Sequence, residues 1–125
     1  MNVLIAPDKF KGSLSAKEVC LAIEKGIKKY DPSINTKKHP LADGGEGTLD
    51  ILKNYFNLTT VIAQVKDPLF NTIFAKYMVS DTTAYIEMAN ASGLQLLKKA
   101  HQNCSETTTF GTGQLILDAI DVGLK

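Results

Sequence analysis

The stretch VLIAPDKFKGSLSAKEVCLAIEKGIKKY, residues 3–30, decides how the fold begins. Its first four residues are all apolar, which is typical of a strand buried on both faces, and Pro7 ends that strand because it has no N–H to donate. Ser15 and Glu18 form an S-x-x-E capping box, which predicts the start of a helix. Apolar residues then recur at helical spacing until Asp31-Pro32, where we expect the helix to stop.

A second short strand is expected around residues 35–39, directly after that helix. A strand, a helix and another strand form the unit from which parallel sheets are built. The glycine-rich segment 42–48 follows, and it leads into a second amphipathic helix with Leu49, Leu52, Tyr55 and Phe56. The N-terminal part is therefore predicted to be an α/β, parallel-sheet (Rossmann-like) unit.

From Thr59 onward the pattern changes to alternation of apolar and polar residues, interrupted by turns at Asp67-Pro68 and Asp81-Thr82. This pattern predicts three strands in an antiparallel meander, followed by helices, the last of them beginning after Gly113 and stopping near Gly123. We predict that residues 1–58 are the N-terminal part of a discontinuous α/β domain. Residues 59–125 are predicted to begin a second, inserted domain, so that the chain represents the front part of a longer protein.

Composition and charge exclude several classes of protein. Hydrophobic residues make up 44% of the 125 residues and charged residues 22%, which is typical of a globular domain and not of a disordered or fibrous one. The net charge is only +1 and there is no arginine, the usual residue for bidentate phosphate and base contacts, so we expect no nucleic-acid partner. No apolar run approaches the roughly 20 residues that a membrane helix needs. We expect a soluble, cytoplasmic protein with no membrane partner.

Two loops early in the chain carry residues suited to chemistry. Residues 7–13 place two lysines and a serine after the first strand, where α/β sheets bind ligands, although on spacing alone a simple helix-capping loop is the better interpretation. Residues 43–48, DGGEGT, combine two carboxylates with three glycines, whose bare backbone lets anionic oxygens approach closely. A tight turn ahead of a helix explains this second segment about equally well.

A third candidate segment, residues 107–113 with the sequence TTTFGTG, precedes the last predicted helix. Hydroxyls and bare amides at a helix start can bind phosphate, but helix capping explains the segment nearly as well. From the residues alone, the three segments point to an α/β protein that handles a small anion or phosphate.

Four motifs in order resemble those of the bacterial glycerate kinases of the first type: APDKFKGSLSA at residues 6–16, LADGGEGT at 41–48, EMANASGL at 87–94 and TTTFGTG at 107–113. The resemblance covers essentially the whole chain. It implies an enzyme that transfers the γ-phosphoryl of ATP to glycerate with Mg²⁺, and an α/β domain built from both chain ends with a second domain inserted between. It also implies a further glycine-rich block beyond residue 125, so we expect the isolated piece to be inactive.

Residue type then suggests the role of each side chain, while the resemblance supports the loops as a whole. Asp43 is the expected catalytic group, which takes or positions the proton of the attacking hydroxyl. Asp8 and Glu46 are expected to hold magnesium. The expected substrate- or phosphate-binding residues are Lys9, Lys11, Ser13, Gly44, Gly45, Gly47, Thr48, Thr109, Gly111, Thr112 and Gly113.

Several alternatives stay open at this point. The main one is a non-catalytic anion- or nucleotide-binding α/β module that uses the same loops without chemistry. The 2-hydroxyl and the 3-hydroxyl of glycerate are both open as the acceptor, as are both enantiomers. The expected small-molecule partners are glycerate and ATP, and a homodimer is the candidate assembly.

Overall fold

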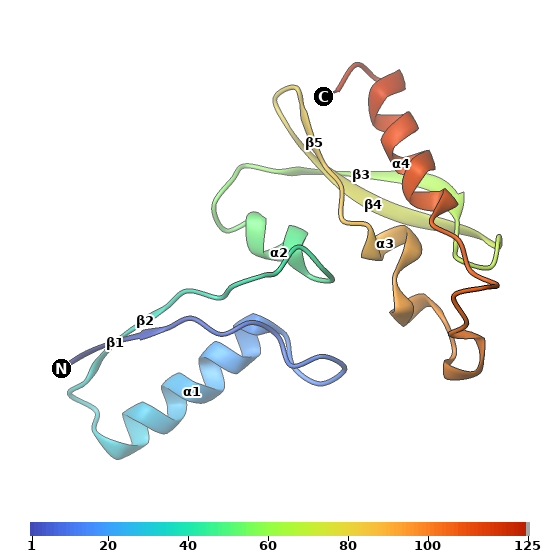
Figure 1. Cartoon of the computed structure of the whole chain (residues 1–125). Helices are drawn as coiled ribbons and strands as arrows, with labels where there is room; N and C mark the ends of the chain where they lie inside the picture. The colour runs from blue at the N-terminus through green and yellow to red at the C-terminus, as the bar shows by residue number, and fades with distance from the viewer. Residues whose placement is uncertain (125) are drawn as a thin grey trace. The chain divides into compact units, whose positions relative to one another are not determined.

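The computed structural model describes residues 1–124 and separates into two compact units, Met1–Asp43 and a second unit that begins at Gly44. Figure 1 shows the elements of each unit along the chain. Our predicted boundary between residues 58 and 59 concerns the domains of a longer chain, and it stays a prediction.

The first unit is the predicted strand–helix–strand. It contains β1 (Asn2–Ile5), α1 (Ala16–Tyr30) and β2 (Asn35–Lys38), and the two strands pair in parallel, with Asn2 opposite Asn35. The capping box of Ser15 and Glu18 is present in both directions. Its hydrogen bonds from Ser15 hold the pKa of Glu18 below the usual value. The local signals that predicted α1 therefore do set its start.

The sheet of the first unit is buried on one side. Ile5 of β1 is buried, as are Val19 and Cys20 of α1, and the Cys20 thiol donates to the Ile5 carbonyl. Leu4, on the opposite side of β1, is 64% exposed. The expectation that β1 is buried on both faces is therefore wrong for the described residues, because α1 covers only one face of a two-stranded sheet.

The second unit contains the predicted antiparallel meander. Its strands β3 (Thr59–Lys66), β4 (Thr72–Ser80) and β5 (Thr83–Tyr85) form a sheet in the order β3-β4-β5. The helix before them, α2 (Thr48–Leu52), ends four residues earlier than the apolar spacing suggested. Phe56 lies beyond the end of α2 and stacks on Tyr85 of β5, with ring centroids 5.9 Å apart. This contact with the sheet accounts for the apolar residue without a longer helix.

The C-terminal elements pack on the face of this sheet that carries Ala63, Ala75 and Tyr77. They are α3 (Ala89–Ser92), the 3-10 turns η1 (Leu94–Leu96) and η2 (Lys99–His101), and α4 (Phe110–Asp121). The core consists of small and apolar side chains from β3, β4, α3 and α4: Ala63, Val65, Ala75, Tyr77, Ala91, Leu115 and Ala119. Gly123, with φ of 81°, follows the end of α4 as predicted.

The start of α4 differs from the prediction, which placed it after Gly113. The helix begins at Phe110, because its first turn packs directly on β3. A Cβ atom at Gly111 would lie 1.8 Å from the Lys66 carbonyl oxygen. The side chain of Gln114 accepts a hydrogen bond of 2.8 Å from the Lys66 N–H. Across residues 1–124, no helix has the length and apolar character needed to cross a membrane.

Candidate functional site

The loop after β1 lies beside the segment that follows β2. Beyond the paired strands, the N–H of His39 donates to the Ile5 carbonyl at 2.8 Å, and the N–H of Leu41 donates to the Pro7 carbonyl at 3.0 Å. These bonds continue the parallel pairing past both strand ends. They bring the start of the first candidate loop next to the residues that lead to Asp43.

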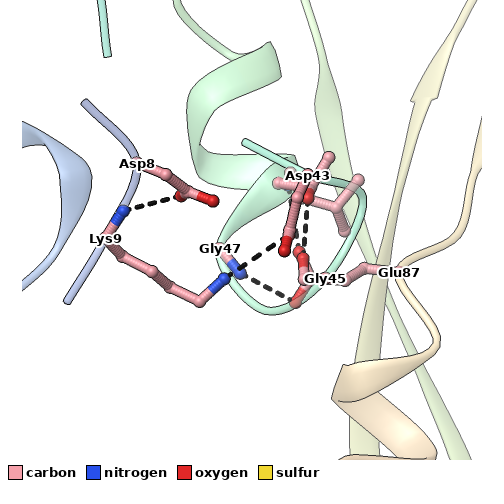
Figure 2. Close-up of polar contacts among 8 residues, drawn as sticks. Asp8, Lys9, Asp43, Gly45, Gly47 and Glu87 are labelled. Atoms are coloured by element: carbon pink, nitrogen blue, oxygen red, sulfur yellow. Dashed lines mark hydrogen bonds and ion pairs between the residues drawn. The ribbon is translucent and has the colours of Figure 1, made fainter. Parts of the chain in front are cut away.

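Lys9 and Asp43 meet at this edge of the first unit. The Lys9 ammonium lies 3.7 Å from a carboxylate oxygen of Asp43. Figure 2 shows the two side chains pointing toward each other. The Lys9 side chain is 20% exposed, whereas that of Asp43 is 68% exposed. The expected catalytic carboxylate is thus accessible to a ligand and is paired with a cation held closer to the protein. The neighbouring Asp8 carboxylate accepts a hydrogen bond from the Lys9 N–H at 2.6 Å.

Lys11 and Ser13 differ from Lys9 in their surroundings. They lie in a turn closed by hydrogen bonds between Phe10 and Leu14, with Gly12 at a φ of 72°. Both side chains are exposed. Their assignment as substrate- or phosphate-binding residues stays a prediction, as does that of Lys9.

The glycine segment forms a tight turn in which two glycines have left-handed backbone. Gly44 has φ of 93° and Gly47 has φ of 89°, values that a residue with a Cβ atom seldom adopts. The turn is closed at Thr48, whose N–H and hydroxyl both donate to the Gly45 carbonyl, at 3.2 and 2.6 Å. Glu46 is exposed at the tip of this turn.

One residue of this region was missed by the sequence prediction. Glu87 is buried, and its carboxylate accepts a hydrogen bond from the Gly47 N–H (Figure 2). It also accepts one from the Leu49 N–H. Its place in the third family-like motif was the available signal. Its hydrogen-bond partners are distant in sequence, so no local sequence pattern could predict them.

The third candidate segment forms the entry to α4 and its first turn. The Thr108 N–H donates to the Pro68 carbonyl at 3.1 Å, and the Thr112 hydroxyl lies 2.7 Å from that of Ser92. Gly111 is buried against β3. These contacts give Gly111 and Thr112 packing roles, while phosphate binding by Thr109, Gly111, Thr112 and Gly113 stays a prediction.

The assignment of Asp8 and Glu46 to magnesium stays a prediction. Nowhere in residues 1–124 do three His, Cys, Asp or Glu side chains gather in a way that would hold a metal ion. Magnesium is commonly bound by one or two carboxylates, with phosphate oxygens and water as its other ligands. Asp8 is in the first unit and Glu46 in the second, and each offers carboxylate oxygens of the type that magnesium prefers.

The comparison with known families decides the classification. The model of the glycerate kinase family matches residues 3–125. The chain belongs to the glycerate kinase family. This confirms the family that the four motifs suggested.

Relatives within the glycerate kinase family align along the whole chain. A glycerate kinase of Bacillus subtilis is 46% identical over 100% of this chain, and one of Halalkalibacterium halodurans is 42% identical over 99%. A glycerate 2-kinase of Escherichia coli is 42% identical over 98%. In each comparison the chain covers 33% of the relative's own length. The chain therefore spans about a third of the curated glycerate kinases that it matches.

A solved structure also agrees with the fold. A crystal structure of a protein assigned as glycerate kinase 2 from Salmonella typhimurium superposes with a TM-score of 0.68 at 43% identity. The match covers 99% of this chain and 34% of that protein. The α/β arrangement, with a parallel pair of strands followed by an antiparallel sheet, is thus confirmed for this chain.

Proposed function

We propose that the full-length protein carrying this sequence is a glycerate kinase that transfers the γ-phosphoryl of ATP to a hydroxyl of glycerate. Family membership and the names of the relatives support this proposal. The observation that carries it is the exposed Asp43 carboxylate, paired with Lys9 and followed at once by the glycine turn. Phosphoryl transfer depends on positioning the reactants and on neutralising charge, and an acid, a cation and an exposed glycine backbone can contribute to both.

Each group has a distinct task in this proposal. Asp43 accepts or orients the proton of the attacking hydroxyl, because it is a carboxylate exposed enough to contact substrate. Lys9 holds that carboxylate and, with Lys11 and Ser13, attracts the carboxylate of glycerate or a phosphate. The glycine turn lets substrate or phosphate oxygens approach its backbone without meeting a side chain, since nothing lies within 4 Å of a Cβ built at Gly44 or Gly47.

ATP and magnesium complete the proposed reaction. Asp8 and Glu46 are the residues that would hold the ion, directly or through water, and the ion would neutralise phosphate charge during transfer. Residues 107–113 are the proposed further phosphate contact. The protein's own contribution is to position the acceptor and to place positive charge near it, since this reaction asks for little covalent chemistry from side chains.

The proposal is tested by the acceptor specificity of the full-length enzyme. ADP release would be followed with ATP and magnesium, using glycerate and, in parallel, glycerol, which has the hydroxyls but lacks the carboxylate. We expect kcat/KM for glycerate to exceed that for glycerol by at least about a hundredfold, because charged hydrogen bonds to a carboxylate are worth about 1.5–3 kcal/mol each. Equal turnover with both acceptors, or ADP release independent of glycerate, would contradict the proposal. Binding without turnover would favour the non-catalytic module.

A further inference from the structure

Glu87 is a buried acid in the link between β5 and α3, and nothing in the proposed chemistry uses it. Only 5% of its surface is exposed. Burying a carboxylate is costly unless it is fully paired. The groups that donate hydrogen bonds to Glu87 therefore indicate its role.

Both partners belong to the glycine turn and the start of α2. One oxygen accepts from the Gly47 N–H at 3.1 Å, and the other accepts from the Leu49 N–H at 3.0 Å. Gly47 is the N-cap residue of α2, and no side chain of its own caps that helix. Glu87 thus supplies from a distance the acceptors that Ser, Thr or Asp at an N-cap would supply locally.

These bonds fix the direction of two backbone amides that lie on either side of Thr48. Thr48 itself is tied back to Gly45 by its N–H and its hydroxyl. The backbone from Gly45 to Leu49 is therefore held at both ends. A glycine-rich segment without such anchors samples many conformations, and ordering it would weaken ligand binding.

We infer that Glu87 is a positioning residue that pre-orders the glycine turn for substrate or phosphate binding. This inference rests on the proposed function of that turn. Glu87 does not contact the ligand itself, because both of its oxygens are engaged by backbone and its surface is buried. Its effect on the reaction passes through the backbone of residues 44–48 and through Glu46 at the tip.

The decisive variant is Glu87→Gln in the full-length enzyme, with Glu106→Gln as the matched control. Glutamine has nearly the same shape but offers one acceptor oxygen and an NH₂ group, so one of the two N–H groups loses its partner. Glu106 is exposed and lies in the link before α4, so the same chemical change there leaves the turn untouched. Two quantities are measured well below the unfolding temperature: kcat/KM for glycerate, and hydrogen exchange of the Gly47 and Leu49 amides.

We expect Glu87→Gln to lower kcat/KM at least about tenfold, mostly through KM, and to speed exchange of those two amides at least about tenfold. Exchange in the core at Leu115 should not change, and Glu106→Gln should match the wild type. Unchanged kinetics and exchange in a folded Glu87→Gln protein would overturn the inference, as would a lower Tm accompanied by unchanged kinetics.

If Glu87→Gln does not fold, Glu87→Asp serves in its place. It keeps the carboxylate but shortens the side chain, so it should weaken both bonds and show the same effects at smaller size. Wild-type kinetics and wild-type exchange in Glu87→Asp would again overturn the inference. Absence of turnover in the wild type would instead overturn the proposed function, and the exchange measurement would then decide alone whether Glu87 holds the turn.

Discussion

The ammonium of Lys9 lies 3.7 Å from the carboxylate of Asp43, in a pair formed by the segments that follow β1 and β2. Because Asp43 is 68% exposed, water screens this pair and its contribution to folding is small. We propose that the pair matters for orientation, because Lys9 can hold the carboxylate that directly precedes the glycine turn in the sequence.

Replacing Asp43 by asparagine should lower kcat of the full-length enzyme at least about a hundredfold. The amide keeps the size of the side chain but can no longer accept the hydroxyl proton, and a positioned proton acceptor contributes about 10²–10⁴ to the rate. Steady-state assays with saturating ATP, magnesium and glycerate measure the effect. Asp81→Asn is the matched control, because Asp81 lies in the exposed turn between β4 and β5. A near-normal kcat for Asp43→Asn would remove this residue from the mechanism.

Replacing Lys9 or Lys11 by methionine should raise KM for glycerate or ATP, or lower kcat, while the Tm changes little. Both side chains lie in a loop, where a charge adds little to the free energy of unfolding. We expect the larger kinetic effect at Lys9, because its replacement also removes the cation that lies beside the Asp43 carboxylate. Lys25→Met, on the exposed side of α1, should leave both kinetics and Tm at their wild-type values. A sharp fall in Tm with unchanged kinetics would instead assign the two lysines to the fold.

Local signals predicted the first unit well. The capping box and Asp31-Pro32 bracket α1, and both act through residues within a few positions of each other. Strict alternation likewise located the meander, because residues facing the same side of a strand are two apart.

Features that depend on contacts between residues far apart in the chain were not predicted from the sequence. The N–H groups of Gly47 and Leu49 find their acceptor at Glu87, about 40 positions away. The beginning of α4 at Phe110 depends on how closely Gly111 approaches Lys66 of β3. The residues next to Gly111 in the sequence do not predict that contact. The site was predicted as separate loops for the same reason, because the pairing of Lys9 with Asp43 depends on how β1 and β2 pair, and not on a local pattern.

Adding a methyl group at Gly111 should destabilise the second unit by about 1–3 kcal/mol, which is the usual cost of overpacking a filled site. The new Cβ would lie 1.8 Å from the Lys66 carbonyl oxygen, so α4 must move away from β3. Gly113→Ala is the control in the same helix, since nothing lies within 4 Å of a Cβ there. It should be neutral or stabilise by about 0.5–1 kcal/mol through helix propensity. Urea unfolding of both full-length variants measures the difference, and equal free energies would contradict the close packing.

The stability of the second unit should fall as the pH rises from about 10 to about 12. Burial, with a further effect of the neighbouring Asp118 carboxylate, raises the pKa of Tyr77 to about 12. The neutral phenol donates to Asp118 at 2.9 Å, so this contribution is complete below the ordinary tyrosine value of 10 and is lost on ionisation. Tyr77→Phe should remove the pH dependence in this range. A Tyr77→Phe profile that parallels the wild type would assign the alkaline unfolding to other groups.

Residues 1–125 expressed alone should not phosphorylate glycerate. The chain spans about a third of the glycerate kinases that it matches, and a kinase must hold nucleotide, metal and acceptor in line. The exposed side of α4 supports the same expectation, because Phe110, Leu117 and Ile120 are 53%, 57% and 60% exposed, and helices that are apolar all round are normally buried.

We therefore expect the isolated piece to self-associate, and Leu117→Lys to reduce that association. ADP release with glycerate and magnesium, measured on protein free of host kinases, tests the activity, and sedimentation tests the association. Glycerate-dependent turnover at the rate of a full-length relative would show that these loops already form a complete site.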